Sequence, residues 1–355
     1  MRRAARAALT AADMADRVYC TYFDHNYLSR GVAMYRSLQR HAPGTRLWVL
    51  CLSEPCHAAL TAMNLPGIVA VPLADFGAAD PEVAATQTTR STIEYFFTLT
   101  PAWMRHVMAR EAGAEWVTYL DGDLYFFASP APIYDELREA SVAIIPHRYA
   151  PNIGRLQRFG TYNVGWVGAR NDADGIAVIG WWRERCIEWC HDYVDGERFA
   201  DQGYLDGFAE RSPRVRAIEN IGANLAPWNI GNYRLSLRNG AVMLDDGCPL
   251  VFFHFQGLRK GLRWFFFTSH RAFNAPLSRI TRNHIYRPHV QELLDVEAVV
   301  EPLLPIAAAT PHRRSAVTDF KQYAEGVLRD LRARLFQALD IVSGRVLLIL
   351  RGRAF

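Results

Sequence analysis

The chain has 355 residues, of which 50% are hydrophobic, enough to form a large core in one or two domains. Its formal net charge of +4 is too small to indicate a nucleic-acid partner. Six cysteines without the spacing of a disulfide framework favour a reducing compartment, and no segment reaches the roughly 20 apolar residues that span a bilayer. We therefore expect a folded, cytoplasmic protein.

The chain begins with a basic, alanine-rich stretch that lacks the continuous apolar core of a signal peptide, so we predict a flexible segment over residues 1–16. Strands and helices then alternate. Such alternation is typical of an α/β fold with a mostly parallel sheet covered by helices, in which ligands bind beyond the carboxyl ends of the strands. The predicted strands cover residues 17–23, 46–52, 67–73 and 115–120, and the predicted helices 31–43, 53–65 and 100–113.

The second half of the domain continues less regularly. Its predicted elements are a short helix over 132–140, a strand over 141–146, a basic loop over 147–160, a strand over 162–170, a tryptophan-rich helix over 175–194, and a last strand over 249–257. We place the domain boundary at 295 and predict a helical extension over 296–355. Its tail, 334–355, alternates apolar clusters with arginines, which fits a basic amphipathic helix on an anionic membrane surface or an ordinary helix packed on the domain.

Two carboxylates interrupt the apolar run WVTYLDGDLYFF, residues 116–127. A buried charge is costly unless it is paired or bound to a metal, so a positive partner is expected beside Asp121 and Asp123. Side chains at i and i+2 of an extended segment face the same side, and Gly122 leaves the space between them open. The pair therefore predicts a hard oxygen site for Mn²⁺ or Mg²⁺, ions that commonly bridge a protein to phosphate oxygens.

Four further motifs accompany this pair. They are FDHNY at 23–27, YNVGW at 162–166, ADQGYLD at 200–206 and HFQGLRK at 254–260. With YLDGD, and in this order, they resemble the motifs of retaining glycosyltransferases of the GT-A fold, in the family of glycogenin and the bacterial lipopolysaccharide galactosyltransferases (glycosyltransferase family 8). The resemblance runs from about residue 17 to 264 and implies a GT-A catalytic domain over 17–295 that uses a nucleotide-diphosphate sugar.

The resemblance also implies how the leaving diphosphate is stabilised. Asp121, Asp123 and His254 would hold the divalent cation, which acts as a Lewis acid on the departing phosphate. Lys260 would meet the diphosphate, with Gly257 in the turn before it, and Arg259 could share this role. The family usually continues Lys-Pro-Trp, whereas Lys260 is followed here by Gly-Leu-Arg-Trp, so a solvated surface lysine is the other interpretation.

The same comparison assigns residues to the sugar. Asp201 and Gln202 would lie near the anomeric carbon, unless Asp201 is only a helix cap. Because an amide is a poor nucleophile, we favour front-face attack, in which the leaving phosphate helps deprotonate the acceptor hydroxyl. Asn163 would hydrogen-bond the sugar and Gly165 would give it room, although Asn163 also fits an ordinary turn.

Asp24 and Asn26 would bind the base and ribose, and Tyr22 or Tyr27 would stack on the base. Family members commonly place an arginine in the helix before the two aspartates, and this chain offers only Arg90 or Arg105.

Two other groups have two interpretations each. Cys186, Cys190 and His191 have helical spacing, but without a second ligand pair they fit core packing better than zinc. The loop that carries Asn224, Trp228 and Asn229 is either an acceptor-sugar platform or a simple connection, while the tryptophans at 181, 182 and 189 fit the core.

We therefore predict a metal-dependent hexosyltransferase that moves galactose or glucose from its UDP form to a saccharide or lipid-linked saccharide (glycolipid), as in bacterial surface polysaccharide synthesis. A sugar-1-phosphate nucleotidyltransferase would need a glycine-rich, arginine-bearing loop after the first strand, where only Gly31 occurs. A phosphatase would need a small hydroxyl residue at the position of Tyr125. A non-catalytic homologue would have no need to bury so many charges.

Overall fold

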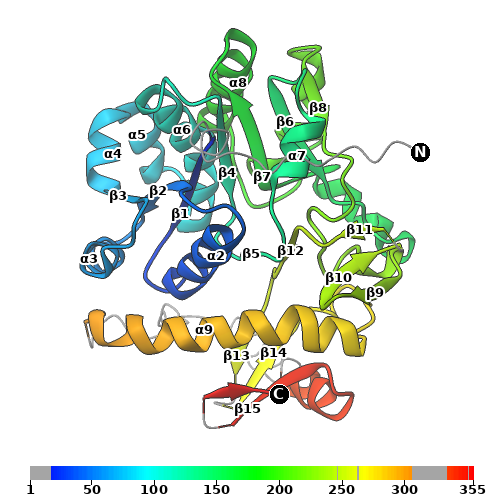
Figure 1. Cartoon of the computed structure of the whole chain (residues 1–355). Helices are drawn as coiled ribbons and strands as arrows, with labels where there is room; N and C mark the ends of the chain where they lie inside the picture. Colours follow the sequence, from blue (N-terminus) through cyan, green and yellow to red (C-terminus); the bar gives the residue numbers. More distant parts are fainter. Residues whose placement is uncertain (1–16, 246, 262–263, 306–333, 351) are drawn as a thin grey trace, which may run out of the picture.

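The computed structural model describes residues 17–245, 247–261, 264–305, 334–350 and 352–355. Its centre is a seven-stranded sheet in the order β3-β2-β1-β4-β7-β6-β8 (Figure 1). Only β7 runs antiparallel to its neighbours in this sheet, so the predicted α/β fold with a mostly parallel sheet and flanking helices is confirmed. The strands are β1 (Arg17–Phe23), β2 (Arg46–Cys51), β3 (Ile68–Pro72), β4 (Trp116–Leu120), β6 (Val142–Pro146), β7 (Tyr162–Arg170) and β8 (Val215–Ala217).

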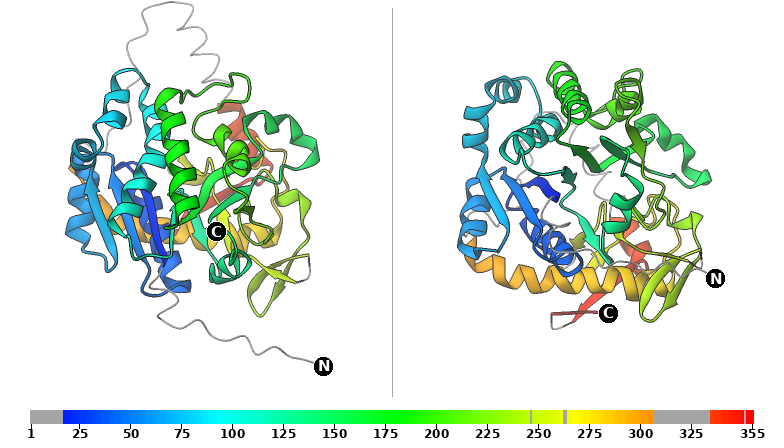
Figure 2. Two further views of the ribbon diagram at one scale, coloured as in Figure 1. Left: turned by 90° about the horizontal axis from the view of Figure 1, so that it is seen from above. Right: turned by 45° about the horizontal axis from the view of Figure 1, so that its top comes forward.

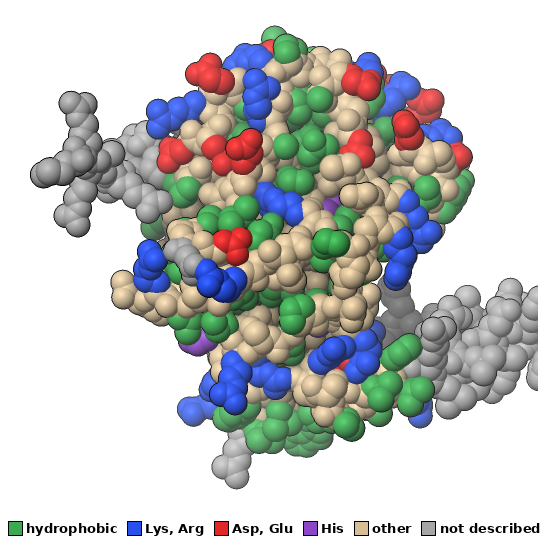
Figure 3. Space-filling model, turned by 90° about the vertical axis from the view of Figure 1, so that its right-hand side faces the viewer, with side chains coloured by type: hydrophobic (Ala, Val, Ile, Leu, Met, Phe, Trp, Pro, Cys, Tyr) green, Lys and Arg blue, Asp and Glu red, His purple; other side chains and the backbone are tan. Residues whose placement is uncertain are grey.

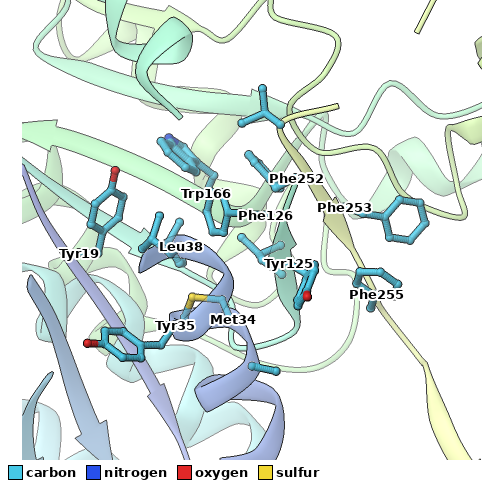
Figure 4. Packing of buried hydrophobic residues seen from close by; sticks show 14 of the residues in the cluster. Tyr19, Met34, Tyr35, Leu38, Tyr125, Phe126, Trp166, Phe252, Phe253 and Phe255 are labelled. Carbon is cyan, nitrogen blue, oxygen red and sulfur yellow. The ribbon is translucent and has the colours of Figure 1, made fainter. Parts of the chain in front are cut away.

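Two hydrophobic cores cover the two faces of this sheet. Alternation along β1 sends Val18 and Cys20 into the core under α6 and α8, and sends Tyr19 into the core shared with α2 and α9. Figure 2 shows the helices that flank the sheet. In the second core, Trp166 stacks on Phe252 with ring centroids 5.5 Å apart (Figure 4). The α-helices are α2 (Leu28–His41), α3 (Glu54–Met63), α4 (Leu73–Ala79), α5 (Pro81–Ala85), α6 (Thr92–Arg110), α7 (Ala131–Glu136), α8 (Ala173–Glu188) and α9 (Arg287–Val300).

Small antiparallel sheets extend the domain beyond the central sheet. The pair of β5 (Leu124–Phe126) and β12 (Phe252–His254) sets His254 opposite Leu124, directly after the two aspartates. A three-stranded sheet contains β9 (Leu235–Arg238), β10 (Ala241–Leu244) and β11 (Cys248–Pro249), and a four-stranded one contains β13 (Arg259–Gly261), β14 (Phe265–Phe267), β15 (Val346–Leu350) and β16 (Arg353–Ala354). Shorter 3-10 helices are η1 (Thr86–Thr88), η2 (Pro151–Phe159), η3 (Gln202–Glu210), η4 (Ile230–Asn232) and η6 (Glu301–Leu303), and η5 (Thr281–Tyr286) is a π-helix.

Most predicted elements are present, but several boundaries differ. The predicted last strand at 249–257, for example, is divided between β11 and β12, which belong to different sheets. Helix α6 begins at Thr92 and not near residue 100, because Ser91 and Glu94 form a capping box and the helix continues through Pro101. The basic loop contains η2, and α8 ends at Glu188, before the second cysteine and the histidine of the proposed helical cluster.

The C-terminal extension is only partly helical. A helix covers 334–342, but 346–350 form the strand β15, which pairs with β14, and β16 follows it. The sequence VLLIL alternates buried and exposed side chains imperfectly, and main-chain pairing with β14 decides its conformation. Helix α9 is continuous across the predicted boundary at 295, while residues 1–16 and 306–333 lie outside the described part of the chain. No helix among the described residues has the length and apolar character required to cross a membrane.

Candidate active site

A cavity of about 770 Å³ opens beyond the carboxyl ends of β1 and β4. Segments far apart in the sequence contribute its wall, as expected for an α/β sheet. Of the predicted site residues, the wall contains Tyr22, Asp24, Asn26, Asp121, Asp123, Asn163, Asp201, Gln202 and His254.

The three predicted metal ligands converge at the floor of this cavity. His254 Nε2 lies 3.1 Å from Asp123 Oδ1 and 3.6 Å from Asp121 Oδ2. One ligand atom from each of the three residues lies within 4.8 Å of the others, and His254 is only 3% exposed. Two carboxylate oxygens and one imidazole nitrogen, open to the cavity on one side, fit a divalent cation that keeps positions for phosphate oxygens.

The pKa values of this trio are mutually dependent. Burial raises the pKa of Asp121 to about 6, against the attraction of His254, and the charge of Asp123 adds to the rise. Burial also opposes ionisation of Asp123, but the charge and hydrogen bond of His254 together hold the pKa of Asp123 below its usual value. The two carboxylates in turn outweigh the burial of His254 and raise its pKa. The site is therefore arranged to hold a positive charge between the carboxylates.

The charges along the cavity wall are almost all negative. Among the described residues, no lysine or arginine lines the cavity, whereas five carboxylates do: Asp24, Asp121, Asp123, Asp192 and Asp201. A diphosphate would be repelled by this wall unless a cation were bound there first. The chemistry of the donor set thus agrees with a resident divalent metal.

Asp201 is a buried carboxyl group that the metal trio does not use. It is 4% exposed, and its main-chain oxygen accepts a hydrogen bond of 2.8 Å from Trp182 Nε1. Burial raises the pKa of Asp201 to about 7, although a hydrogen bond from Thr100 favours its ionised form. The helix-cap interpretation does not hold, because the Asp201 side chain makes no capping hydrogen bond to η3.

At the end of the cavity that contains Asp24, where the resemblance predicts the nucleotide, local hydrogen bonds hold the chain. Asp24 accepts from the main-chain nitrogens of Asn26 and Tyr27 at 2.9 and 3.2 Å, and from Asn26 Nδ2 at 2.8 Å. The hydroxyl group of Tyr22 is hydrogen-bonded to that of Thr100, with 3.1 Å between the two oxygens. The side chain of Tyr27 is 44% exposed, and the guanidinium of Arg30 lies over its ring. Tyr27 is therefore the more accessible of the two rings for stacking on a base.

The structure does not bring every predicted residue to the cavity. Lys260 lies on β13 and donates a 2.6 Å hydrogen bond to Glu297 of α9, outside the cavity wall. Gly257 adopts φ +74 in the turn before β13 and also lies outside the wall. Arg259 lies over the ring of Phe267. The antiparallel pairing of β13 with β14, which the sequence did not reveal, turns this segment away from the site.

The other candidates have structural partners. Arg105 donates to the Ile176 carbonyl and Arg90 to the Ile187 carbonyl, so neither lines the cavity, and α6 presents Ile93, Phe96 and Phe97 instead. Among the described residues, the aspartate–histidine trio is grouped so that it could hold a metal ion, whereas the cysteine cluster is not. Cys186 and Cys190 are fully buried, which fits core packing.

His147 and Tyr149 were not among the predicted site residues, but they line the cavity together with Trp228 of the proposed acceptor-sugar loop. The rings of His147 and Tyr149 are stacked 4.4 Å apart, and Trp228 donates from Nε1 to the His147 carbonyl at 2.9 Å. Asn229 donates to the main-chain carbonyls of His147 and Asn224, so it braces this wall and does not reach the cavity. His147 and Tyr149 stand two residues apart directly after a strand, and this spacing is the sequence pattern that could have indicated them.

Comparison with known proteins gives both relatives and solved structures. The structure is similar to galactosyltransferase LgtC in complex with donor and acceptor sugar analogs (TM-score 0.46, 21% identity, 67% of this chain and 87% of that chain). It is also similar to mouse xyloside xylosyltransferase 1 (TM-score 0.45, 14% identity, 68% and 98%) and to GlyE of Streptococcus pneumoniae (0.45, 14%, 81% and 62%). At TM-scores below 0.5 these likenesses do not assign a function.

No protein-family model matches the chain. In sequence it is 35% identical to the uncharacterized protein YfnF of Bacillus subtilis over 249 residues, covering 68% of this chain and 81% of YfnF. It is 34% identical to the uncharacterized protein YfnD of the same organism over 242 residues, covering 67% of this chain and 77% of YfnD. The chain therefore belongs to the family of YfnF and YfnD.

Proposed function

We propose that the protein is a metal-dependent glycosyltransferase that takes a hexose from a nucleotide-diphosphate sugar. The observation that carries this proposal is the meeting of Asp121, Asp123 and His254 at the floor of a cavity without a lysine or arginine in its described wall. When bound, Mn²⁺ or Mg²⁺ would neutralise the diphosphate as its negative charge grows. Asp121, Asp123 and His254 would hold the cation at the position where the charge of the leaving diphosphate develops.

Transfer with retention is proposed from the family resemblance, and the remaining residues bear on its route. Both polar atoms of the Gln202 amide are hydrogen-bonded within the protein, so this side chain is a poor candidate for a nucleophile. The buried Asp201 lies on the cavity wall, where it can bind a sugar hydroxyl. We accordingly favour a front-face reaction, with UDP-galactose or UDP-glucose as donor and a saccharide or glycolipid of a bacterial surface polysaccharide as acceptor.

A nucleotidyltransferase is the second candidate, and the packing of Gly31 disfavours it. A Cβ at Gly31 would lie 2.1 Å from the ring of Phe23, so this glycine serves the contact between α2 and β1. No phosphate-binding loop is needed to explain it. Tyr125 is also unsuited to a phosphatase, because its hydroxyl accepts a hydrogen bond from Arg40 of α2 and its side chain lies outside the cavity wall.

A donor panel tests the proposal. The purified protein is incubated with UDP-, GDP-, dTDP- and CMP-sugars, with Mn²⁺ or with a chelator, and free nucleotide is measured. We expect release of one nucleotide with metal and little release with chelator. Equal turnover in the chelator would contradict metal dependence, and failure of every sugar nucleotide to bind would contradict the transferase.

We further propose that the protein works in the cytoplasm and touches an anionic membrane through its C-terminal region. Support comes from its free cysteines, from the exposed apolar side chains of the helix 334–342 and from exposed arginines at 334 and 353. Figure 3 shows hydrophobic and basic side chains together at the lower end of the molecule. We expect the double variant Leu335→Asp, Val342→Asp to lose binding to phosphatidylglycerol vesicles in a sedimentation assay. The exposed pair Ile176→Asp, Val299→Asp is the control, and equal binding by both variants would reject this surface.

A further inference from the structure

A line of hydrogen bonds runs behind the proposed metal site, from His254 to the main chain of η2. His254 Nδ1 lies 3.1 Å from Asn163 Oδ1, and Asn163 Nδ2 lies 3.2 Å from Gln202 Oε1. Gln202 Nε2 then donates to the carbonyl oxygen of Phe159 at 2.7 Å. We call the side chains of Asn163 and Gln202 the amide pair. It joins β7 and η3 to the metal ligand on β12.

Two main-chain groups fix the orientation of this amide pair. At one end the nitrogen of Gly165 lies 3.2 Å from Asn163 Oδ1, and a main-chain N–H can only donate. At the other end the carbonyl of Phe159 can only accept, so the Gln202 atom facing it must be the amide nitrogen. Both ends therefore require the same arrangement, with the oxygen of Asn163 toward His254 and its nitrogen toward Gln202.

This arrangement determines which ring nitrogen of His254 can bind a metal. Because Asn163 Oδ1 is an acceptor, Nδ1 of His254 must carry a hydrogen. In the neutral ring the lone pair then lies on Nε2, the atom that faces Asp121 and Asp123. A metal-binding histidine commonly has its other nitrogen held in this way, and the outer partner sets both tautomer and ring orientation.

Gly165 leaves just enough space for the Asn163 amide and the His254 ring to pack against each other. A Cβ at Gly165 would lie 2.6 Å from Asn163 Oδ1 and 2.9 Å from His254 Nδ1. Any side chain at 165 would thus push the amide or the ring out of place. Asn163 itself is 7% exposed and His254 is 3% exposed, so water has little access to replace the hydrogen bond between them.

We propose that Asn163 and Gln202 are positioning residues for the metal, which hold His254 with Nε2 directed at the two aspartates. The inference rests on the proposed function, because it assumes that the trio binds a metal. It gives Gln202 a different role from that of a group at the anomeric carbon, since Gln202 acts on the metal through Asn163. The amide pair is thereby the link between the sugar-facing end of the cavity and its metal-binding floor.

Binding of Mn²⁺ alone tests this proposal without any sugar nucleotide. The dissociation constant is measured from the electron paramagnetic resonance signal of free Mn²⁺, for the full-length chain and its variants. We expect Gln202→Met and Asn163→Leu, which keep side-chain volume but lose the amide, to weaken Mn²⁺ binding by about 10-fold to 100-fold. Asn163→Asp keeps an acceptor for His254 Nδ1 and Gly165 but loses the donor to Gln202 Oε1, so it is expected to weaken Mn²⁺ binding less than Asn163→Leu does.

Control variants distinguish a loss of His254 positioning from a general disturbance of the fold. Gln157→Met changes an exposed glutamine of the neighbouring η2 and should leave the Mn²⁺ affinity unchanged. Because the amide pair acts as one unit, Asn163→Leu and Gln202→Met together should cost little more than Asn163→Leu alone. Wild-type affinity in Gln202→Met, or equal affinities in Asn163→Asp and Asn163→Leu, would overturn the proposal while the metal site stands. Failure of the wild-type chain to bind Mn²⁺ would overturn the metal site as well.

Discussion

Replacing Asp123 by alanine is expected to lower kcat/KM for sugar-nucleotide turnover by about 10³-fold, because Lewis-acid stabilisation is worth several kcal/mol and each 1.4 kcal/mol is a factor of ten. Asp123 provides the oxygen nearest to His254 Nε2, at 3.1 Å, so its loss leaves an incomplete ligand set. The fall should appear mainly in kcat, since the metal stabilises charge that develops during departure. Initial rates across a range of Mn²⁺ and donor concentrations measure the effect.

The matched control is Asp192→Ala. Asp192 also lines the cavity but lies outside the metal trio, so this variant should keep most of its activity. A comparable loss in both variants would mean that the whole acidic wall, and not the trio, determines activity. Undiminished turnover by Asp123→Ala in the presence of a chelator would refute the metal site.

Replacing Asp201 by asparagine is expected to stabilise the fold at pH 8 while it lowers activity. In the folded state the pKa of Asp201 is raised from 3.8 to about 7, so the folded protein holds this proton more tightly than the unfolded chain does. The contribution of Asp201 to the free energy of unfolding is therefore fully present below pH 3.8 and is lost as the pH rises to about 7. The loss amounts to about 4 kcal/mol at most, and asparagine avoids it because it does not titrate.

Denaturant unfolding of both proteins without metal, at pH 5 and pH 8, measures this prediction. The difference in unfolding free energy between variant and wild type should grow toward pH 8, while turnover by the variant falls because the carboxylate no longer binds the sugar. Asp206→Asn, at a solvent-exposed carboxylate of η3, is the control and should show no such growth. A pH-independent difference for Asp201→Asn would show that Asp201 ionises normally in the folded protein.

The fold was largely predictable because its strands and helices keep clear hydrophobic periods. The start of α6 was predicted too late, at residue 100, because the Ser91–Glu94 capping box begins the helix at Thr92 and the helix continues through Pro101. Strand β15 could not be predicted from the local sequence pattern. Val346–Leu350 is a short apolar run that suits a helix or a strand, and only its pairing with β14 settles the choice.

The candidate site was predictable where its residues follow strands of the central sheet. Asp24 and Asp121 come directly after β1 and β4, and parallel pairing of these neighbours brings their ends together. Lys260 lies outside the cavity wall, and its position depends on β13, a strand of three residues with no sequence pattern of its own. The proposed positioning role of Gln202 could not be inferred from the sequence, because a hydrogen bond to a main-chain carbonyl leaves no pattern in the sequence.

The pairing of β15 with β14 has a consequence for handling this protein. Strand β14 reads Phe265–Phe267, and its main-chain groups on one side are occupied by residues 346–348. A chain that ended before Val346 would leave three phenylalanines on an open strand edge, and such edges pair readily with other molecules. We therefore expect residues 346–350 to protect this strand edge from aggregation, so truncated variants of the chain should keep them.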